Sequence, residues 1–201
     1  MVPAVTGLLG GAFDPPHNGH LVLAEHAIRH FDLARLVVVV TGIAPHKRIP
    51  TDAETRFRLA EAAFGGRPPI ELSRHELELD MPAYTVDTAR WAEERFGEVV
   101  FVVGADEFAD FLEWKDPNTI LVHVRLGVGT RPGFARERLE RILAELEQPE
   151  RVELFDIPAL PTASREIRDR VARGEAIDHL VPAAVAELVS KLGLYRAPDE
   201  G

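Results

Sequence analysis

Two short apolar segments with a helical pattern between them constrain the fold of this chain more than any other feature. Residues 5–9 and 36–40 have the length of strands, and the second is continuous and mostly β-branched, as in a strand buried on both faces. Between them, one face of a helix is marked by four apolar residues, Leu21, Ala24, Ile28 and Phe31. A strand, a helix and a strand within about forty residues form a βαβ unit, which predicts a parallel sheet with a right-handed crossover.

The same alternation continues along the chain. Further strands are predicted at 70–79, as an irregular edge segment, and at 99–103, 121–129 and 152–157. Helices are predicted at 56–64, 84–96, 108–114 and 139–146, with a closing helix through 181–192. The predicted fold class is therefore α/β, a doubly wound parallel sheet of Rossmann-like type. We expect a single domain over residues 1–201, with a helical C-terminal part from about residue 162.

Charge and cysteine content exclude several classes of function. The chain has 23 Lys and Arg against 33 Asp and Glu, a net charge of −10, which argues against non-specific nucleic-acid binding. It has no cysteine, so disulfides, thiolate metal sites and a thiol nucleophile are excluded. No apolar run approaches the ~20 residues of a membrane span, and no secretion signal is recognisable. We expect a cytoplasmic protein without membrane contact, and leave its oligomeric state, including a homo-oligomer, open.

Residues 10–20, GGAFDPPHNGH, lie between the first predicted strand and the first predicted helix. Free N–H groups and the helix dipole favour an anion at such a junction, and glycine lets the backbone approach it closely. His17 and His20 can donate hydrogen bonds to phosphate oxygens. Two alternatives remain: both histidines are exposed turn residues, or they bind zinc together with Asp14. Phosphate binding explains the glycines, which a zinc site does not need.

Four loops follow apolar runs and are expected at the same edge of the sheet. They are residues 10–20, 45–48, 104–106 and 164–168. Ligands of open parallel sheets bind beyond the carboxyl ends of the strands, so these loops are predicted to line one crevice. Its basic residues are His17, His20, His46, Lys47, Arg48, Arg165 and Arg168.

The segment from Gly11 to His20, which reads G-x-F-D-P-x-H-x-G-H, resembles the signature of the nucleotidylyltransferase superfamily. An ordered set of further motifs resembles the bacterial nicotinate-nucleotide adenylyltransferases over nearly the whole chain. These are PHK at 45–47, YTVDT at 84–88, GAD at 104–106 with Trp114, RPG at 131–133, S-x-x-I-R at 164–168 and LGLY at 192–195. The resemblance implies adenylyl transfer from ATP to nicotinate mononucleotide, which yields deamido-NAD and pyrophosphate in NAD biosynthesis.

The resemblance also implies roles for individual residues. Catalysis would depend on His17, His20, Lys47 and Arg168. ATP would contact Gly11, Ala12, Phe13, His17, Gly19, His20, Gly104, Asp106, Arg131, Ser164, Ile167 and Arg168. The acceptor would contact Thr41, Lys47, Tyr84, Thr85, Trp114 and Lys115, with the indole of Trp114 stacked on the pyridine ring. Tyr195 is expected to pack rather than to bind.

The residues alone leave plainer interpretations open. Lys47 and His46 would then be solvated loop residues, Ser164 and Arg168 a helix cap and a surface charge, Asp106 a helix cap, and Trp114 a core residue. Ala12 and Arg165 stand where relatives have threonine, and the loop at 40–44 lacks an asparagine that is frequent there. These departures leave the phosphate contacts and the preference for nicotinate over nicotinamide mononucleotide open.

The acceptor phosphate is an anion at pH 7, so the implied reaction needs neither a general base nor a protein nucleophile. Catalysis would reduce to alignment and charge stabilisation. We expect no protein metal site, with Mg²⁺ entering bound to ATP and water. Two other functions remain in view: a different adenylyl- or cytidylyltransferase, with a nicotinamide mononucleotide or pantetheine phosphate acceptor, and a non-catalytic nucleotide-binding protein.

Overall fold

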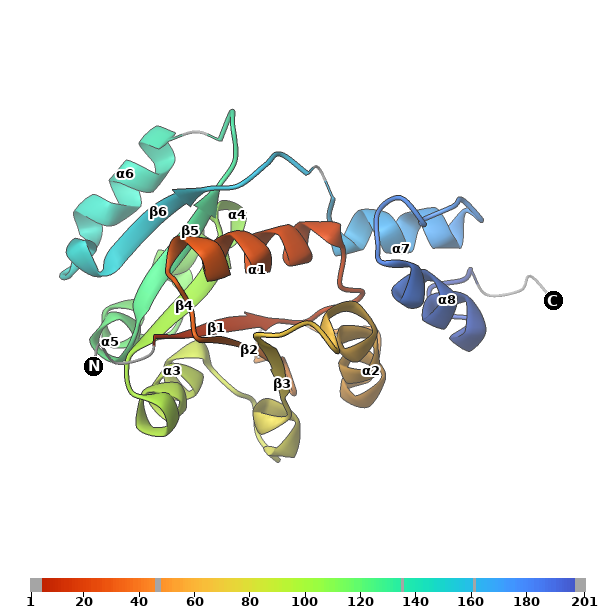
Figure 1. Cartoon of the computed structure of the whole chain (residues 1–201), viewed down its shortest axis with the longest axis horizontal. Coiled ribbons are helices and arrows are strands. Elements are labelled where there is room, and N and C mark those ends of the chain that lie inside the picture. Colours follow the sequence, from red (N-terminus) through yellow and green to blue (C-terminus); the bar gives the residue numbers. More distant parts are fainter. Residues whose placement is uncertain (1–4, 46–47, 135, 161, 198–201) are drawn as a thin grey trace.

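The computed structural model describes residues 5–45, 48–134, 136–160 and 162–197. Its centre is one six-stranded parallel sheet in the order β3-β2-β1-β4-β5-β6 (Figure 1). The strands are β1 (Thr6–Gly11), β2 (Arg35–Val40), β3 (Ile70–Ser73), β4 (Val99–Gly104), β5 (Arg125–Thr130) and β6 (Val152–Asp156). The strand order reverses between β1 and β4, and the prediction of a doubly wound parallel sheet is confirmed.

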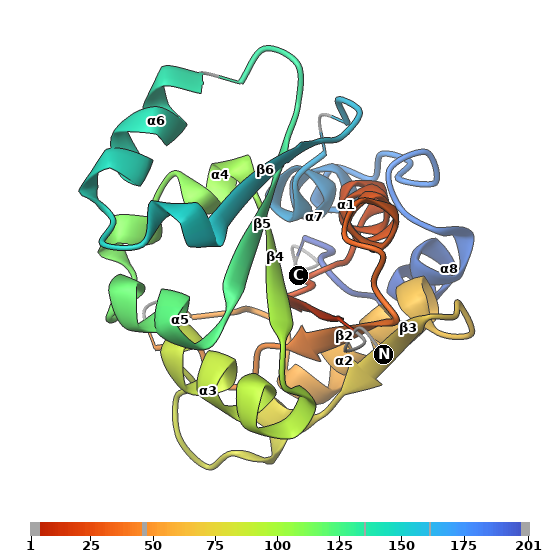
Figure 2. The same ribbon diagram turned by 60° about the vertical axis from the view of Figure 1, so that its left-hand side comes forward.

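Helices cover both faces of this sheet (Figure 2). They are α1 (Asn18–His30), α2 (Ala53–Phe64), α3 (Thr85–Phe96), α4 (Ala105–Phe108), α5 (Pro117–His123), α6 (Arg136–Glu145), α7 (Ser164–Ala172) and α8 (Ala183–Leu192). Alternate residues of each strand point into two separate cores: Leu9 packs with α1, α2 and α8, whereas Leu8 packs with α3, α5 and α6. Both faces of β1 and β2 are therefore buried, as the continuous apolar run predicts.

Three element predictions are wrong in whole or in part. The edge segment predicted at 70–79 is a strand only as far as Ser73, and residues 75–78 form a 3-10 turn. Residues 121–129 are not one strand, because α5 occupies Pro117–His123 and β5 begins at Arg125. Asp116 adopts a left-handed conformation (φ 51°) and Pro117 takes the first helical position, where its missing N–H costs nothing. Leu121 is a fully buried residue of that helix, and its apolar character alone suggests a strand.

The single helix predicted at 108–114 is also wrong. It is split into α4 and a 3-10 turn at Phe111–Glu113. Phe108 and Phe111 are both fully buried and their rings stack at 5.5 Å, so the segment follows the core rather than a regular helix. Gly97, in contrast, ends α3 at φ 78° as predicted.

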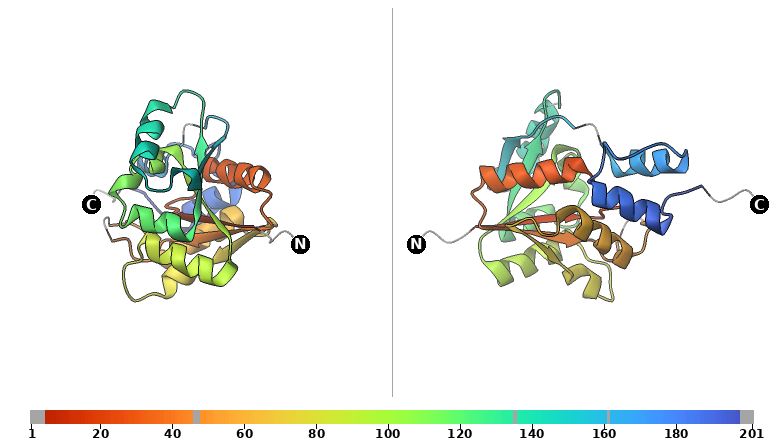
Figure 3. Two further views of the ribbon diagram at one scale, coloured as in Figure 1. Left: turned by 90° about the vertical axis from the view of Figure 1, so that its left-hand side faces the viewer. Right: turned by 45° about the vertical axis from the view of Figure 1, so that its right-hand side comes forward.

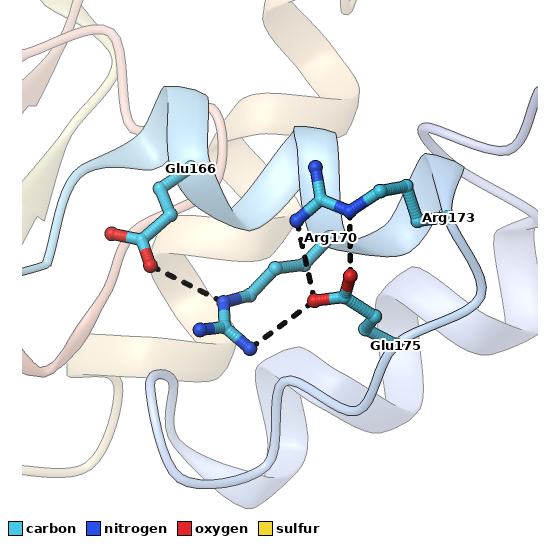
Figure 4. A network of polar contacts seen from close by, with 4 residues as sticks. All are labelled: Glu166, Arg170, Arg173 and Glu175. Atoms are coloured by element: carbon cyan, nitrogen blue, oxygen red, sulfur yellow. Dashed lines mark hydrogen bonds and ion pairs between the residues drawn. The ribbon is translucent and has the colours of Figure 1, made fainter.

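The C-terminal helices α7 and α8 lie beyond the carboxyl end of β1 (Figures 1 and 3). Ile167 of α7 and Val185 and Val189 of α8 join the core beneath α1 and α2. At the end of α7, Arg170 donates to Glu166, and Arg170 and Arg173 both donate to Glu175, which ties down the turn that follows (Figure 4). Within the described ranges, no helix is long and apolar enough to cross a membrane.

Candidate active site

The loops that follow β1, β2, β4 and β5 meet at one edge of the sheet. Gly11 ends β1 and Gly104 ends β4, and these two strands are neighbours on either side of the point where the strand order reverses. Thr41 continues the pairing of β1 with β2, since its N–H donates to the Gly11 carbonyl at 2.9 Å. Three of the four loops predicted to share a crevice are described at this edge. His46 and Lys47 of the remaining loop lie outside the described residues.

The turn between β1 and α1 is held by a buried phenylalanine. Phe13 has a left-handed backbone (φ 50°), and its side chain is only 2% exposed. Its ring meets those of Phe64 and His20 edge to face, with centroids 5.5 and 5.1 Å away. A Cβ on Gly11 would lie 3.1 Å from this ring, which explains the glycine there. Phe13 can therefore face a nucleotide only through its backbone.

The two histidines at the start of α1 form one stacked pair. Their ring centroids lie 3.7 Å apart with 26° between the planes, and Gly19 leaves room for the His17 ring, since a Cβ there would stand 3.0 Å from its Nδ1. The backbone N–H of His17 donates to Nδ1 of His20 at 3.1 Å. Because Nδ1 accepts, the proton of a neutral His20 lies on Nε2, where it can be donated to a ligand.

Both imidazoles are neutral at pH 7. Burial lowers the pKa of His17 from 6.5 to about 4. Burial, together with the proximity of His17, lowers the pKa of His20 well below 6.5. The pair thus acts through N–H donation rather than through positive charge. Among the described residues, no group of three His, Asp or Glu side chains is arranged to hold a metal ion.

The C-terminal part of the chain is fastened to the same turn. Arg168 donates from Nη1 to the Asp14 carbonyl at 2.7 Å, and the Ser164 hydroxyl donates to the Pro15 carbonyl at 2.9 Å. The Ser164 proton is thereby committed in this structure, so a phosphate would meet the N–H groups of this helix start. Arg168 keeps further N–H groups for a ligand.

Tyr195 is more than the packing residue predicted from the sequence. Its hydroxyl donates to Oδ1 of Asp14 at 2.6 Å, and Asp14 is only 3% exposed. Burial and this bond raise the pKa of the Tyr195 hydroxyl, which stays protonated. The bond joins residues 181 positions apart in the sequence, so no local pattern could have indicated it.

Ile167 is a core residue in the structure. The sequence interpretation placed it among the residues that contact ATP, but its side chain is fully buried and its backbone N–H donates to the Ala163 carbonyl at 3.1 Å. Its role is to pack α7 against the core, which positions Ser164 and Arg168.

Asp106 and Arg131, both predicted to face the nucleotide, form an ion pair. Nη2 of Arg131 lies 3.0 Å from Oδ2 of Asp106, across the ends of β4 and β5. Gly104 is the residue at the N-cap of α4, and no side chain caps this helix, so the plainer interpretation of Asp106 as a cap is wrong. Both side chains remain partly exposed and open to a ligand.

Three of the residues predicted to contact the acceptor, Tyr84, Thr85 and Lys115, lie at the start of α3. Tyr84 precedes the helix and Thr85 is its first residue, and Nζ of Lys115 lies 4.0 Å from the centre of the Tyr84 ring. Trp114 is half-buried and meets the rings of Phe101 and Phe111 edge to face, at 6.4 and 5.3 Å. The first N–H groups of α3 point away from the helix, as a carboxylate or phosphate requires.

Sequence reasoning also missed Arg56, which is fully buried in the first turns of α2. Its guanidinium donates to the carbonyls of Ala12 and Thr41, one in each of the loops after β1 and β2. Arg56 stands in an ordinary amphipathic helix pattern, so nothing in the sequence indicates that its side chain binds these loops.

Comparisons with known proteins identify the family to which this chain is related. The cytidylyltransferase-like family model matches residues 8–170. A protein of Moorella thermoacetica, named a probable nicotinate-nucleotide adenylyltransferase, is 39% identical, with 99% of this chain and 95% of that protein covered. A Rubrobacter xylanophilus protein of the same name is 36% identical, with 95% and 92% covered.

Solved structures show the same fold. Nicotinic acid mononucleotide adenylyltransferase of Plasmodium falciparum, complexed with NaAD, superimposes with a TM-score of 0.77 over 96% of this chain and 97% of that chain, at 19% identity. A structure from Vibrio parahaemolyticus matches with a TM-score of 0.67 at 21% identity over 96% of each chain. The sequence of this chain is related over nearly its full length to the Moorella thermoacetica and Rubrobacter xylanophilus proteins of that name. This chain therefore belongs to the nicotinate-nucleotide adenylyltransferase family.

Proposed function

We propose that the chain transfers the adenylyl group of ATP to the phosphate of nicotinate mononucleotide, with release of pyrophosphate and formation of deamido-NAD. The single observation that carries the proposal is the stacked, neutral histidine pair at the start of α1, set at the point where the strand order reverses. Family membership supports the choice of substrates.

The acceptor phosphate attacks the α-phosphorus of ATP, and the bond from that phosphorus to the β-phosphate bridging oxygen breaks. The attacking oxygen is already ionised at pH 7, so no residue needs to remove a proton. The site aligns the two phosphates and stabilises the charge on the transferring and leaving groups.

His20 donates from Nε2 to an oxygen of the transferring phosphate, because its Nδ1 is already an acceptor. The N–H groups at the start of α1 and the ring of His17 complete this end of the site. Arg168, held by the Asp14 carbonyl, contacts the leaving pyrophosphate. Lys47 is assigned to the phosphates of ATP by the family resemblance.

Mg²⁺ enters with ATP in this proposal. The described residues present no carboxylate cluster for it, and Mg²⁺ retains water and phosphate ligands readily. The ion would neutralise part of the triphosphate charge.

The test is product analysis with matched acceptors. The purified chain is incubated with Mg²⁺ and ATP, and with either nicotinate or nicotinamide mononucleotide. Pyrophosphate and the dinucleotide are then quantified together. We expect stoichiometric pyrophosphate and deamido-NAD with the nicotinate acceptor, and no turnover when EDTA exceeds Mg²⁺. ATP binding without either product would identify a non-catalytic nucleotide-binding protein instead.

A further inference from the structure

Arg56 joins the two halves of the site by hydrogen bonds to backbone carbonyls. Its Nη1 donates to the Ala12 carbonyl at 3.0 Å and to the Thr41 carbonyl at 2.6 Å, and its Nη2 donates to the Gly42 carbonyl at 3.0 Å. Its Nε donates to the Thr51 carbonyl at 3.0 Å. One side chain thus binds three separate turns: the one after β1, the one after β2, and the one before α2.

Burial makes this arrangement unusual for a structural arginine. The side chain is 1% exposed, and among the described residues no carboxylate lies within ion-pair distance of it. Burial lowers the pKa of Arg56, and the nearby Asp14 raises it, but arginine retains its charge in proteins. A buried charge is costly unless its donors are satisfied, and here four carbonyls satisfy it.

The loop after β2 is also confined from its other side. A Cβ on Gly42 would lie 2.1 Å from the backbone oxygen of Glu76, so this loop packs directly on the 3-10 turn His75–Glu78. The Thr88 hydroxyl of α3 in turn donates to Oε1 of Glu76 at 2.7 Å. The loop is therefore packed between Arg56 and this 3-10 turn, and α3, which begins the acceptor cluster, is connected to it through Glu76.

We propose that Arg56 is a positioning residue for adenylyl transfer, which fixes the spacing between the turn that holds ATP and the loop that borders the acceptor. The inference rests on the proposed function, since it assigns one substrate to each turn. In-line transfer requires the acceptor oxygen and the α-phosphorus to approach within about 3–3.5 Å, and a displacement of about 1 Å can cost 100-fold in rate. Arg56 touches neither substrate and acts only through Ala12, Thr41 and Gly42.

Lysine cannot replace this function. Three different nitrogens of the planar Arg56 guanidinium donate to carbonyls of the three turns, whereas a lysine ammonium donates from one atom. Arg56→Lys retains the charge and loses the bridge between the turns. Gly42→Ala disturbs the same loop from the opposite side, because its new methyl group displaces the loop from Glu76.

The experiment separates positioning from stability. For wild type, Arg56→Lys and Gly42→Ala, kcat and KM are measured with Mg²⁺, ATP and nicotinate mononucleotide. The Kd of a non-hydrolysable ATP analogue and the Kd of nicotinate mononucleotide are measured separately by calorimetry. Leu139→Ala is the matched control, because Leu139 of α6 is 1% exposed and belongs to a core that includes no residue of the turns bound by Arg56.

We expect Arg56→Lys to lower kcat by about 10- to 100-fold while the Kd of each substrate alone changes by less than about threefold. Leu139→Ala should lower the unfolding midpoint and leave kcat per folded molecule unchanged. A kcat of Arg56→Lys within twofold of wild type overturns the inference, as does a loss confined to the two Kd values. If Arg56→Lys yields no folded protein, Gly42→Ala decides in the same way. A wild-type chain that makes no dinucleotide refutes the proposed function instead.

Discussion

The burial of His17 predicts a specific pH dependence of stability. His17 is 8% exposed, and burial lowers its pKa from 6.5 to about 4. Because the unfolded chain then binds more protons than the folded chain between these values, stability falls as the pH drops from 6.5 towards 4. At about 1.36 kcal/mol per pH unit, the full effect is about 3 kcal/mol. Between pH 7.5 and pH 5 it is about 2 kcal/mol.

The assay is urea unfolding of wild type and His17→Gln at several pH values. Glutamine is neutral throughout, so the difference between the two free energies of unfolding reports the titration of His17 together with its effect on the stacked His20. We expect wild type to lose about 2 kcal/mol more than His17→Gln between pH 7.5 and pH 5. If the free energies of unfolding of wild type and His17→Gln change with pH in parallel, within about 0.5 kcal/mol, then His17 is not a buried neutral imidazole in the folded chain.

Three further substitutions test the site. His20→Ala should lower kcat per folded molecule by at least about 100-fold, measured by pyrophosphate release with the folded fraction taken from urea titration. A loss of stability without a loss of kcat per folded molecule would contradict the catalytic role. Trp114→Ala should raise the Kd of nicotinate mononucleotide by about tenfold and leave that of the ATP analogue unchanged, whereas equal losses would exclude stacking on the acceptor. Tyr195→Phe removes the donor to buried Asp14 and should reduce the free energy of unfolding by about 1.5–3 kcal/mol, and a loss below about 0.5 would show that water replaces the hydroxyl.

The sheet was predictable because its signals are local. The β-branched run at 36–40 can bury both of its faces only in a sheet that is covered by helices on both sides. The helical pattern before it predicts a crossover connection between two parallel strands. The error at 121–129 arose where a local signal was outweighed. Leu121 suggests a strand by composition, but the preceding Pro117 at a first helical position marks a helix start. An apolar run of this length fits either element until its flanking residues are weighed.

The sequence predicts which loops form the site, but it does not predict the side-chain hydrogen bonds that join these loops. Glycine spacing and the strand ends place the loops containing Gly11, Thr41 and Gly104 at one edge of the sheet. The bonds of Arg56 to Ala12 and Thr41 span 44 and 15 residues, and they end on carbonyls, which every residue has. The sequence does not indicate which backbone carbonyls lack a backbone partner in a turn and so can accept from a side chain.

These carbonyl contacts also explain why the geometry of the site depends on the cores below it. Ordering one loop residue costs about 1–2 kcal/mol, while a hydrogen bond adds only about 0.5–1.5 kcal/mol of net stability. The bonds of Arg56 and Tyr195 therefore cannot order the turns unaided. Packing of Phe13 against Phe64 fixes the first turn, and the pairing of Thr41 with Gly11 fixes the second. The polar bonds then select one arrangement among those that the cores allow. A small packing change at Phe64 should therefore shift the turns and lower kcat before it measurably lowers the free energy of unfolding.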